Sequence, residues 1–129
     1  MAIVGDFVVV DSGGRRIGDN TGSVKTYSRS FGTGGRDSKH EAYLSLMVAG
    51  VISPSASLPE IKINNERVGF ISRNTSSAID DFHNQIFAFD GDVLKSGNNT
   101  ITISSAFLNS GSAIDFSVRS VVCHFHQNA

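Results

Sequence analysis

Residues 94–103 read LKSGNNTITI, a turn followed by an alternating strand, and they carry the clearest local signal in the chain. Asp92 can cap a short helical turn in front of this stretch, and Gly97 can adopt the left-handed backbone conformation that ends such a turn. The side-chain amide of Asn99 can then bond the backbone groups of the turn. Isoleucine alternates with threonine after it, so the isoleucines share one face of a strand, and we expect that face to enter the core.

Seven other stretches show strand-like patterns between turn signals, and no segment keeps a helical apolar period. With Asn99–Phe107, the expected strands are Ile3–Val10, Val24–Phe31, Ala42–Val51, Glu60–Asn64, Arg67–Ser72, Gln85–Phe89 and Ala113–His126. Propensity alone leaves a helix open for Ala42–Val51, but the flanking Gly and Pro favour a strand. Both faces of Ala113–His126 are apolar near its end, which indicates a central strand or a bulge around Arg119-Ser120. The chain is therefore expected to be all-β: one domain, residues 1–129, folded as a two-sheet antiparallel jelly-roll β-sandwich of about eight strands.

The composition argues against several classes of protein. The formal net charge is -1 and the longest basic run is the pair Arg15-Arg16, so no nucleic-acid partner is expected. The single cysteine, Cys123, excludes an internal disulfide and lies in an apolar strand pattern, where a buried thiol is the favoured interpretation. No apolar run approaches the roughly 20 residues that span a bilayer, and Met1–Val10 lacks the features of a signal peptide. We expect a soluble protein and assign no compartment.

Residues 42–122 resemble the galactose-binding-domain-like superfamily. The segment at 94–103 is similar to that family's Leu-Lys-x-Gly-x-Asn-x-Ile-x-Ile segment, and three further segments match its strands: Ile61–Gly69, Ile86–Asp90 and Asp115–Val118. Asn65 departs from the pattern, because the family commonly has Gly at that turn position. The resemblance implies a jelly-roll module of the carbohydrate-binding type, as found beside glycosidase catalytic domains. The matching residues are structural in the family and do not identify a ligand.

Alternate loops of an antiparallel sandwich fall at the same end when each strand crosses its full length. Loops 11–22, 52–58, 72–84 and 107–112 would then share one end, where loops collect the donors and acceptors that hydroxyl-rich ligands need. The candidate ligand-binding residues at this end are Arg16, Asn20, Arg73, Asn74, Asp80, Asp81, His83 and Asn84. The alternative is that these are ordinary solvated loops.

Two further groups of residues suggest metal chemistry. His124 and His126 fall on one side of a strand, about 7 Å apart along it, and could serve a metal if a third ligand converged on them. A frayed C-terminal strand end is the favoured interpretation of this pair. The carboxylate pairs Asp90/Asp92 and Asp80/Asp81 could hold a structural calcium ion, although Asp-Gly-Asp is also an ordinary turn. Otherwise no cofactor is expected.

The leading functional hypothesis is a noncatalytic, lectin-like protein that binds glycans through the loops at one end. The chain has no Trp and only Tyr27 and Tyr43, so a stacking platform for sugar must come from Tyr, Phe or His. The alternative is a structural or assembly subunit that forms a homo-oligomer or docks to a protein partner. A small metal-dependent enzyme is a third hypothesis, which would need the third ligand for the two histidines.

Overall fold

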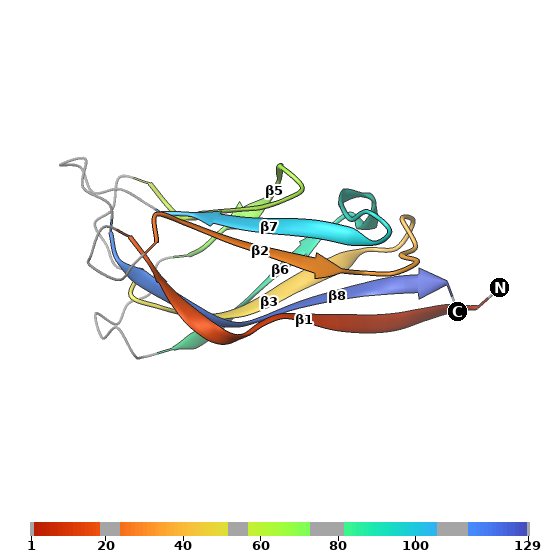
Figure 1. Ribbon diagram of the computed structural model, residues 1–129, viewed down its shortest axis with the longest axis horizontal. Coiled ribbons are helices and arrows are strands. Elements are labelled where there is room, and N and C mark those ends of the chain that lie inside the picture. The colour runs from red at the N-terminus through yellow and green to blue at the C-terminus, as the bar shows by residue number, and fades with distance from the viewer. Residues whose placement is uncertain (1, 19–23, 52–56, 73–81, 106–113, 129) are drawn as a thin grey trace.

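The computed structural model describes residues 2–18, 24–51, 57–72, 82–105 and 114–128. They form two four-stranded sheets that face each other (Figure 1). Sheet A has the strand order β1-β8-β3-β6 and sheet B the order β2-β7-β4-β5, and neighbouring strands run antiparallel throughout. The strands are β1 (Ile3–Ile17), β2 (Thr26–Gly32), β3 (Ala42–Ala49), β4 (Glu60–Ile63), β5 (Glu66–Phe70), β6 (His83–Phe89), β7 (Asn98–Ser104) and β8 (Phe116–Asn128). The expected eight-stranded antiparallel β-sandwich is confirmed.

The core lies between the sheets and is built from alternate positions of each strand. In β3, Leu44, Leu46 and Val48 are fully buried, while Tyr43 on the opposite parity is exposed. In β7, Ile101 is fully buried like the next isoleucine two positions on, as the sequence pattern predicted. This alternation is that of a strand, so the helix left open for residues 42–51 is excluded.

The turn before β7 is held by one buried side chain. Asn99 is 1% exposed, accepts a hydrogen bond from the backbone N–H of Lys95 at 2.7 Å, and donates to the carbonyls of Lys95 and Gly97, both at 3.1 Å. Gly97 has φ 89°, the left-handed conformation expected for it. The capping role expected for Asp92 is wrong. A short 3-10 helix, η1 (Gly91–Val93), contains Asp92, and its N-cap Asp90 makes no side-chain capping bond.

The first strand is longer than the sequence predicted. The breaker-like residues from Asp11 to Gly14 do not end β1, which continues to Ile17, so the expected loop 11–22 is wrong over its first half. The reason is the partner strand: β8 pairs with both halves of β1, and the register shifts between Val9 and Asp11 and between Asp11 and Gly14 absorb the extra residues.

The C-terminal strand is not frayed at the two histidines. β8 continues to Asn128, which pairs with Ile3 of β1, so the fraying expected for His124 and His126 is wrong. The bulge expected at Arg119-Ser120 is confirmed, because Ser120 has φ 54° and the pairing with β3 shifts register there.

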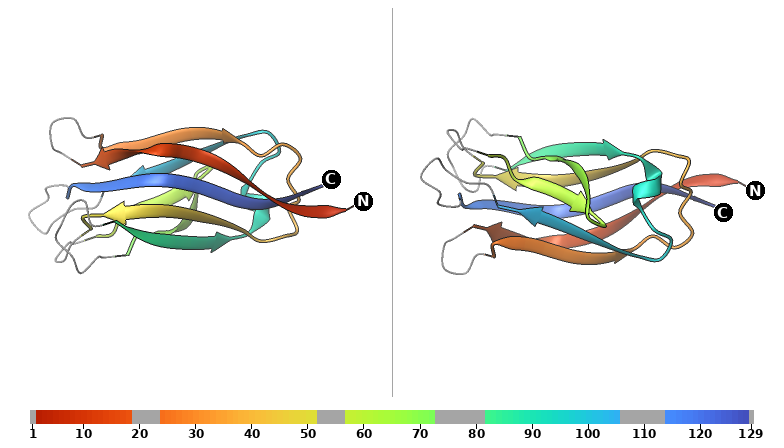
Figure 2. Two further views of the ribbon diagram at one scale, coloured as in Figure 1. Left: turned by 90° about the horizontal axis from the view of Figure 1, so that it is seen from below. Right: turned by 90° about the horizontal axis from the view of Figure 1, so that it is seen from above.

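The two ends of the sandwich differ in what they carry. Strands β1, β3, β5 and β7 end, and β2, β4, β6 and β8 begin, at the end away from the chain termini (Figure 2). The sequence placed its polar loops at this end, and the strand ends that flank them do gather there. The opposite end carries η1, the segment 33–41 and both termini. In the described ranges, no helix is long and apolar enough to cross a membrane.

Candidate functional site

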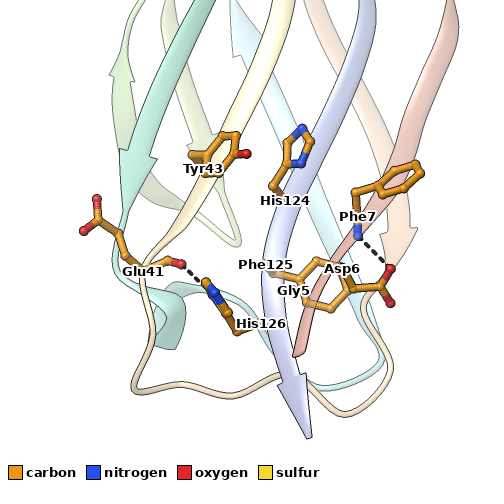
Figure 3. Close-up of a pocket in the computed structure, with 8 residues that line it drawn as sticks. All are labelled: Gly5, Asp6, Phe7, Glu41, Tyr43, His124, Phe125 and His126. Carbon is orange, nitrogen blue, oxygen red and sulfur yellow. Dashed lines mark hydrogen bonds between the residues drawn. The ribbon is translucent and has the colours of Figure 1, made fainter. Parts of the chain in front are cut away.

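Three aromatic side chains line up on the outer face of sheet A, the face turned away from sheet B. Register places Phe7 of β1 and Tyr43 of β3 on either side of His124 in β8. The Tyr43 and His124 rings stack with centroids 4.4 Å apart and planes 13° apart, and the Phe7 ring lies 6.1 Å from His124 (Figure 3). Phe7 is 60% and Tyr43 42% exposed. We call these three residues the aromatic platform.

A pocket of about 240 Å³ adjoins the platform on the side of the chain termini. Its polar lining comes from Asp6, Glu41 and His126 (Figure 3). Nδ1 of His126 lies 3.2 Å from the backbone carbonyl oxygen of Glu41. The centroids of the His126 and His40 rings are 5.0 Å apart. The Gln127 amide donates to the Asp6 carboxylate. Aromatic faces and hydrogen-bonding groups therefore meet in one shallow hollow.

A contact between His40 and Asp37 borders this hollow. Nδ1 of His40 lies 2.8 Å from the carboxylate of Asp37. The pKa of Asp37 is lowered, first by the backbone N–H of Lys39 and then by the hydrogen bond and charge of His40. Asp37 is therefore ionised near neutral pH, which orients the His40 ring that lies beside His126.

A second pocket, of about 330 Å³, lies on sheet A near the opposite end. Three arginines line it together with a phenylalanine: Arg15, Arg16, Arg119 and Phe82. The guanidinium carbon of Arg119 lies 3.9 Å from the centroid of the Phe82 ring, a close cation–π contact. We call this site the arginine pocket.

The structure describes only three of the eight residues of the predicted loop-end site. Arg16 lies in β1, opposite Ser117, and lines the arginine pocket. His83 and Asn84 open β6 but line neither pocket: the His83 ring lies 2.8 Å from the Gln85 amide, and Asn84 is exposed opposite Met47. The other predicted residues, which are Asn20, Arg73, Asn74, Asp80 and Asp81, lie outside the described residues.

Sequence reasoning missed most of the residues that form the two pockets. Tyr43 had been noted only as one of the two tyrosines, and nothing linked it to Phe7 or His124. Arg119 had been noted only as part of a bulge. The missing information is register, because a strand's own pattern identifies its outer face but not the neighbours it meets there.

The metal interpretations gain no third ligand from the described part of the chain. His124 stacks on Tyr43 and has the tilted Phe7 ring 6.1 Å away on its other side, whereas His126 turns toward Glu41 and His40. No group of three or more His, Cys, Asp or Glu side chains in the described ranges is arranged to hold a metal ion. Asp80 and Asp81 lie outside those ranges, so a structural calcium ion there stays a prediction.

The one cysteine is buried, as expected. Cys123 faces the core of sheet A, and burial raises the pKa of its thiol to about 12. The thiol therefore stays protonated at neutral pH and is a poor nucleophile.

Comparison with known proteins locates the fold. No protein-family model matches the chain, and neither does any curated protein. A β-porphyranase of glycoside hydrolase family 86 from the human gut bacterium Bacteroides plebeius superposes with a TM-score of 0.63 and 21% identity, over 97% of this chain and 21% of the enzyme. A family 35 carbohydrate binding module from an environmental isolate gives 0.54 and 16%, over 100% of this chain and 98% of the module. The enzyme BuGH86 in complex with neoagarooctaose gives 0.54 and 16%, over 98% and 20%.

These likenesses define the class of structure. The chain shares the β-sandwich fold of these structures, at low sequence identity. It spans about a fifth of the length of the two enzymes and nearly all of the solved module. Because fold does not define ligand, function must be argued from the outer face of sheet A.

Proposed function

We propose that this protein is a noncatalytic carbohydrate-binding module that receives sugar rings on the aromatic platform. The observation that carries the proposal is the row of Phe7, His124 and Tyr43, exposed side by side on three hydrogen-bonded strands. The apolar C–H face of a sugar ring packs on an aromatic face, and rings held by strands need little further ordering when a ligand binds.

The surroundings of the platform suit a hydroxylated ligand. Ligand sites are largely apolar with a few placed polar groups, and here the polar ring of His126 lies beside the platform, on the same parity of β8 as His124. The chain has no Trp, and the proposed stacking surface consists of a Phe, a Tyr and a His. The proposal moves the glycan site from the loops at one end to the face of sheet A.

The comparisons support the class of function without naming a ligand. One solved structure of matching length is a family 35 carbohydrate binding module, and a second is BuGH86 in complex with neoagarooctaose. If the protein binds without catalysis, an oligosaccharide incubated with it should be recovered intact. Chromatography of the ligand after overnight incubation tests that part of the proposal.

A glycan array followed by calorimetry on the strongest ligands tests the site. Tyr43→Ala should weaken binding about tenfold, because an aromatic contact contributes about 0.5–1.5 kcal/mol beyond the area it buries. Phe70→Ala is the matched control: Phe70 has the same 42% exposure but lies on sheet B. Glycan binding that Tyr43→Ala leaves unchanged would refute the platform, and an array without any signal would refute the function.

A second candidate, an assembly subunit, is favoured by the apolar strip beside the platform. Val9 is 50% and Ile86 61% exposed, and register places Val122 and Ser45 between them on the same face. Exposed apolar surface of this kind marks contact sites. Native mass spectrometry separates the candidates: a stable oligomer that Ile86→Lys disperses, together with an empty glycan array, would favour assembly over sugar binding.

A further inference from the structure

We propose that the arginine pocket is an anion subsite of the same binding face, so that the glycan is acidic and carries sulfate or carboxylate groups. The inference rests on the proposed function, because it takes the aromatic platform as the site of the sugar rings. It adds the chemical class of the ligand and a second contact point.

Strand pairing brings Arg16 and Arg119 onto one face of sheet A. Arg16 lies opposite Ser117 and Gly14 lies opposite Arg119, so both side chains belong to the outer face, whereas Arg15, opposite the buried Val118, has the inward parity. Neighbouring strands are only about 4.8 Å apart, which concentrates positive charge in a chain whose net charge is -1.

In the part of the chain that the structure describes, two other arginines have a carboxylate partner and these do not. Arg29 lies 3.3 Å from the Asp11 carboxylate, and Arg67 lies 2.7 Å from that of Glu60. Within the described ranges, no carboxylate lies at ion-pair distance from Arg15, Arg16 or Arg119. Among the described residues that line the pocket, the only charged side chains are arginines, and an anionic group would neutralise them.

Phe82 holds the guanidinium group of Arg119 in place. The Arg119 guanidinium lies 3.9 Å over its ring, and the stacking orders a side chain that would otherwise be free to rotate. A planar guanidinium offers paired N–H donors that match the oxygen atoms of a carboxylate or sulfate. The pocket volume of about 330 Å³ leaves room for such a group on a sugar ring.

A bulge puts the arginine pocket and the platform on one face. Arg119 and His124 are five positions apart in β8, and in a regular strand they would point to opposite faces. Ser120, with φ 54°, interrupts the alternation, so that Val118, Val121 and Cys123 all stay buried while both Arg119 and His124 face outward. The two sites are then about 15 Å apart along the strand, farther than one sugar ring reaches. The ligand is therefore an oligosaccharide lying along β8.

Calorimetry on the full chain at low salt with three oligosaccharides tests the inference. The probes are neoagarooctaose as the neutral galactan, a carrageenan oligosaccharide of the same length as the sulfated one, and an oligogalacturonate as the carboxylated one. We expect at least one acidic probe to bind more tightly than the neutral one and to weaken as salt rises from about 50 to 200 mM. Arg16→Ala and Arg119→Ala should each weaken that binding about tenfold and reduce its salt dependence.

Two variants control for charge and for folding. Arg119→Lys keeps the charge but loses the stacked, forked geometry, and it should recover only part of the affinity. Arg67→Ala removes a cation that is paired on sheet B and should bind like the wild type. Thermal melting of each variant establishes that it is folded before it is titrated.

The outcomes separate this inference from the proposed function. Tyr43-dependent binding of the neutral probe, with the arginine variants and salt without effect, would overturn the anion subsite and leave the glycan platform standing. Arginine-dependent binding that ignores Tyr43→Ala would overturn the platform instead. Single-stranded DNA that binds through the same arginines more tightly than every oligosaccharide would overturn the inference in favour of nucleic acid.

Discussion

Replacing Asn99 with alanine should cost the fold about 3–7 kcal/mol. The side chain accepts from the Lys95 N–H at 2.7 Å and from the Asn64 amide at 2.8 Å, and it donates to the carbonyls of Lys95 and Gly97 and to the Thr33 hydroxyl at 3.2 Å. Asn64 and Thr33 keep other partners, the Val93 and Lys95 carbonyls, whereas the Lys95 N–H would have none among these groups.

The magnitude follows from that inventory. One orphaned, largely buried N–H costs about 1–3 kcal/mol, and each remaining bond whose partner keeps another contact contributes about 0.5–1 kcal/mol. The sum is a large part of the 5–15 kcal/mol that separates a typical folded domain from its unfolded chain, where about 10 is common. The turn that leads into β7 would loosen with it.

Urea unfolding followed by far-UV circular dichroism measures the loss, since the chain has no Trp to report by fluorescence. Asn98→Ala is the control, because its side chain is exposed at the start of the same strand, and it should change stability by less than about 0.5 kcal/mol. An Asn99→Ala protein within about 1 kcal/mol of the wild type would refute the reasoning that this side chain organises the turn.

Three other predictions concern Gly91 of η1 and the buried Cys123. Gly91→Ala should lower the melting temperature by several degrees, because the new Cβ would lie 2.1 Å from the His40 carbonyl oxygen, whereas Gly35→Ala meets nothing within 4 Å and should be neutral. The Cys123 thiol should resist a thiol reagent at about pH 8 until denaturant is added, since its pKa of about 12 keeps it protonated in the native state; labelling of the native protein at the rate of a free thiol would contradict this. Stability should fall as pH rises from 9 toward 12, because the unfolded thiol ionises near 9.0 while the folded one still binds its proton, and Cys123→Ala should flatten that slope in urea titrations at each pH.

Burial of Tyr27 acts in the same alkaline range. Its pKa is raised by desolvation first and then by its hydrogen bond to Asp11, so the folded state also retains this proton after the unfolded chain has lost it near pH 10.0. At high pH, the unfolded state therefore binds fewer protons at both groups than the folded state does. The free energy of unfolding then falls as pH rises.

Local sequence patterns predicted most of the scaffold. The buried positions Leu44 and Ile101 follow from period-two alternation, and the Asn64-Asn65 hairpin turn and the left-handed Gly97 follow from residues that tolerate positive φ. These features depend on residues within a few positions of each other, and for that reason a single sequence reveals them.

The binding face depended on contacts between strands far apart in the chain. Phe7, Tyr43 and His124 meet because β1 and β3 flank β8, and no property of any one strand specifies that order or register. The Asp11–Gly14 stretch has the composition of a loop, yet it stays in a strand because β8 supplies its pairing partners. Side-chain direction is a local property of the backbone, whereas the neighbour across a sheet is chosen by the packing of the whole domain.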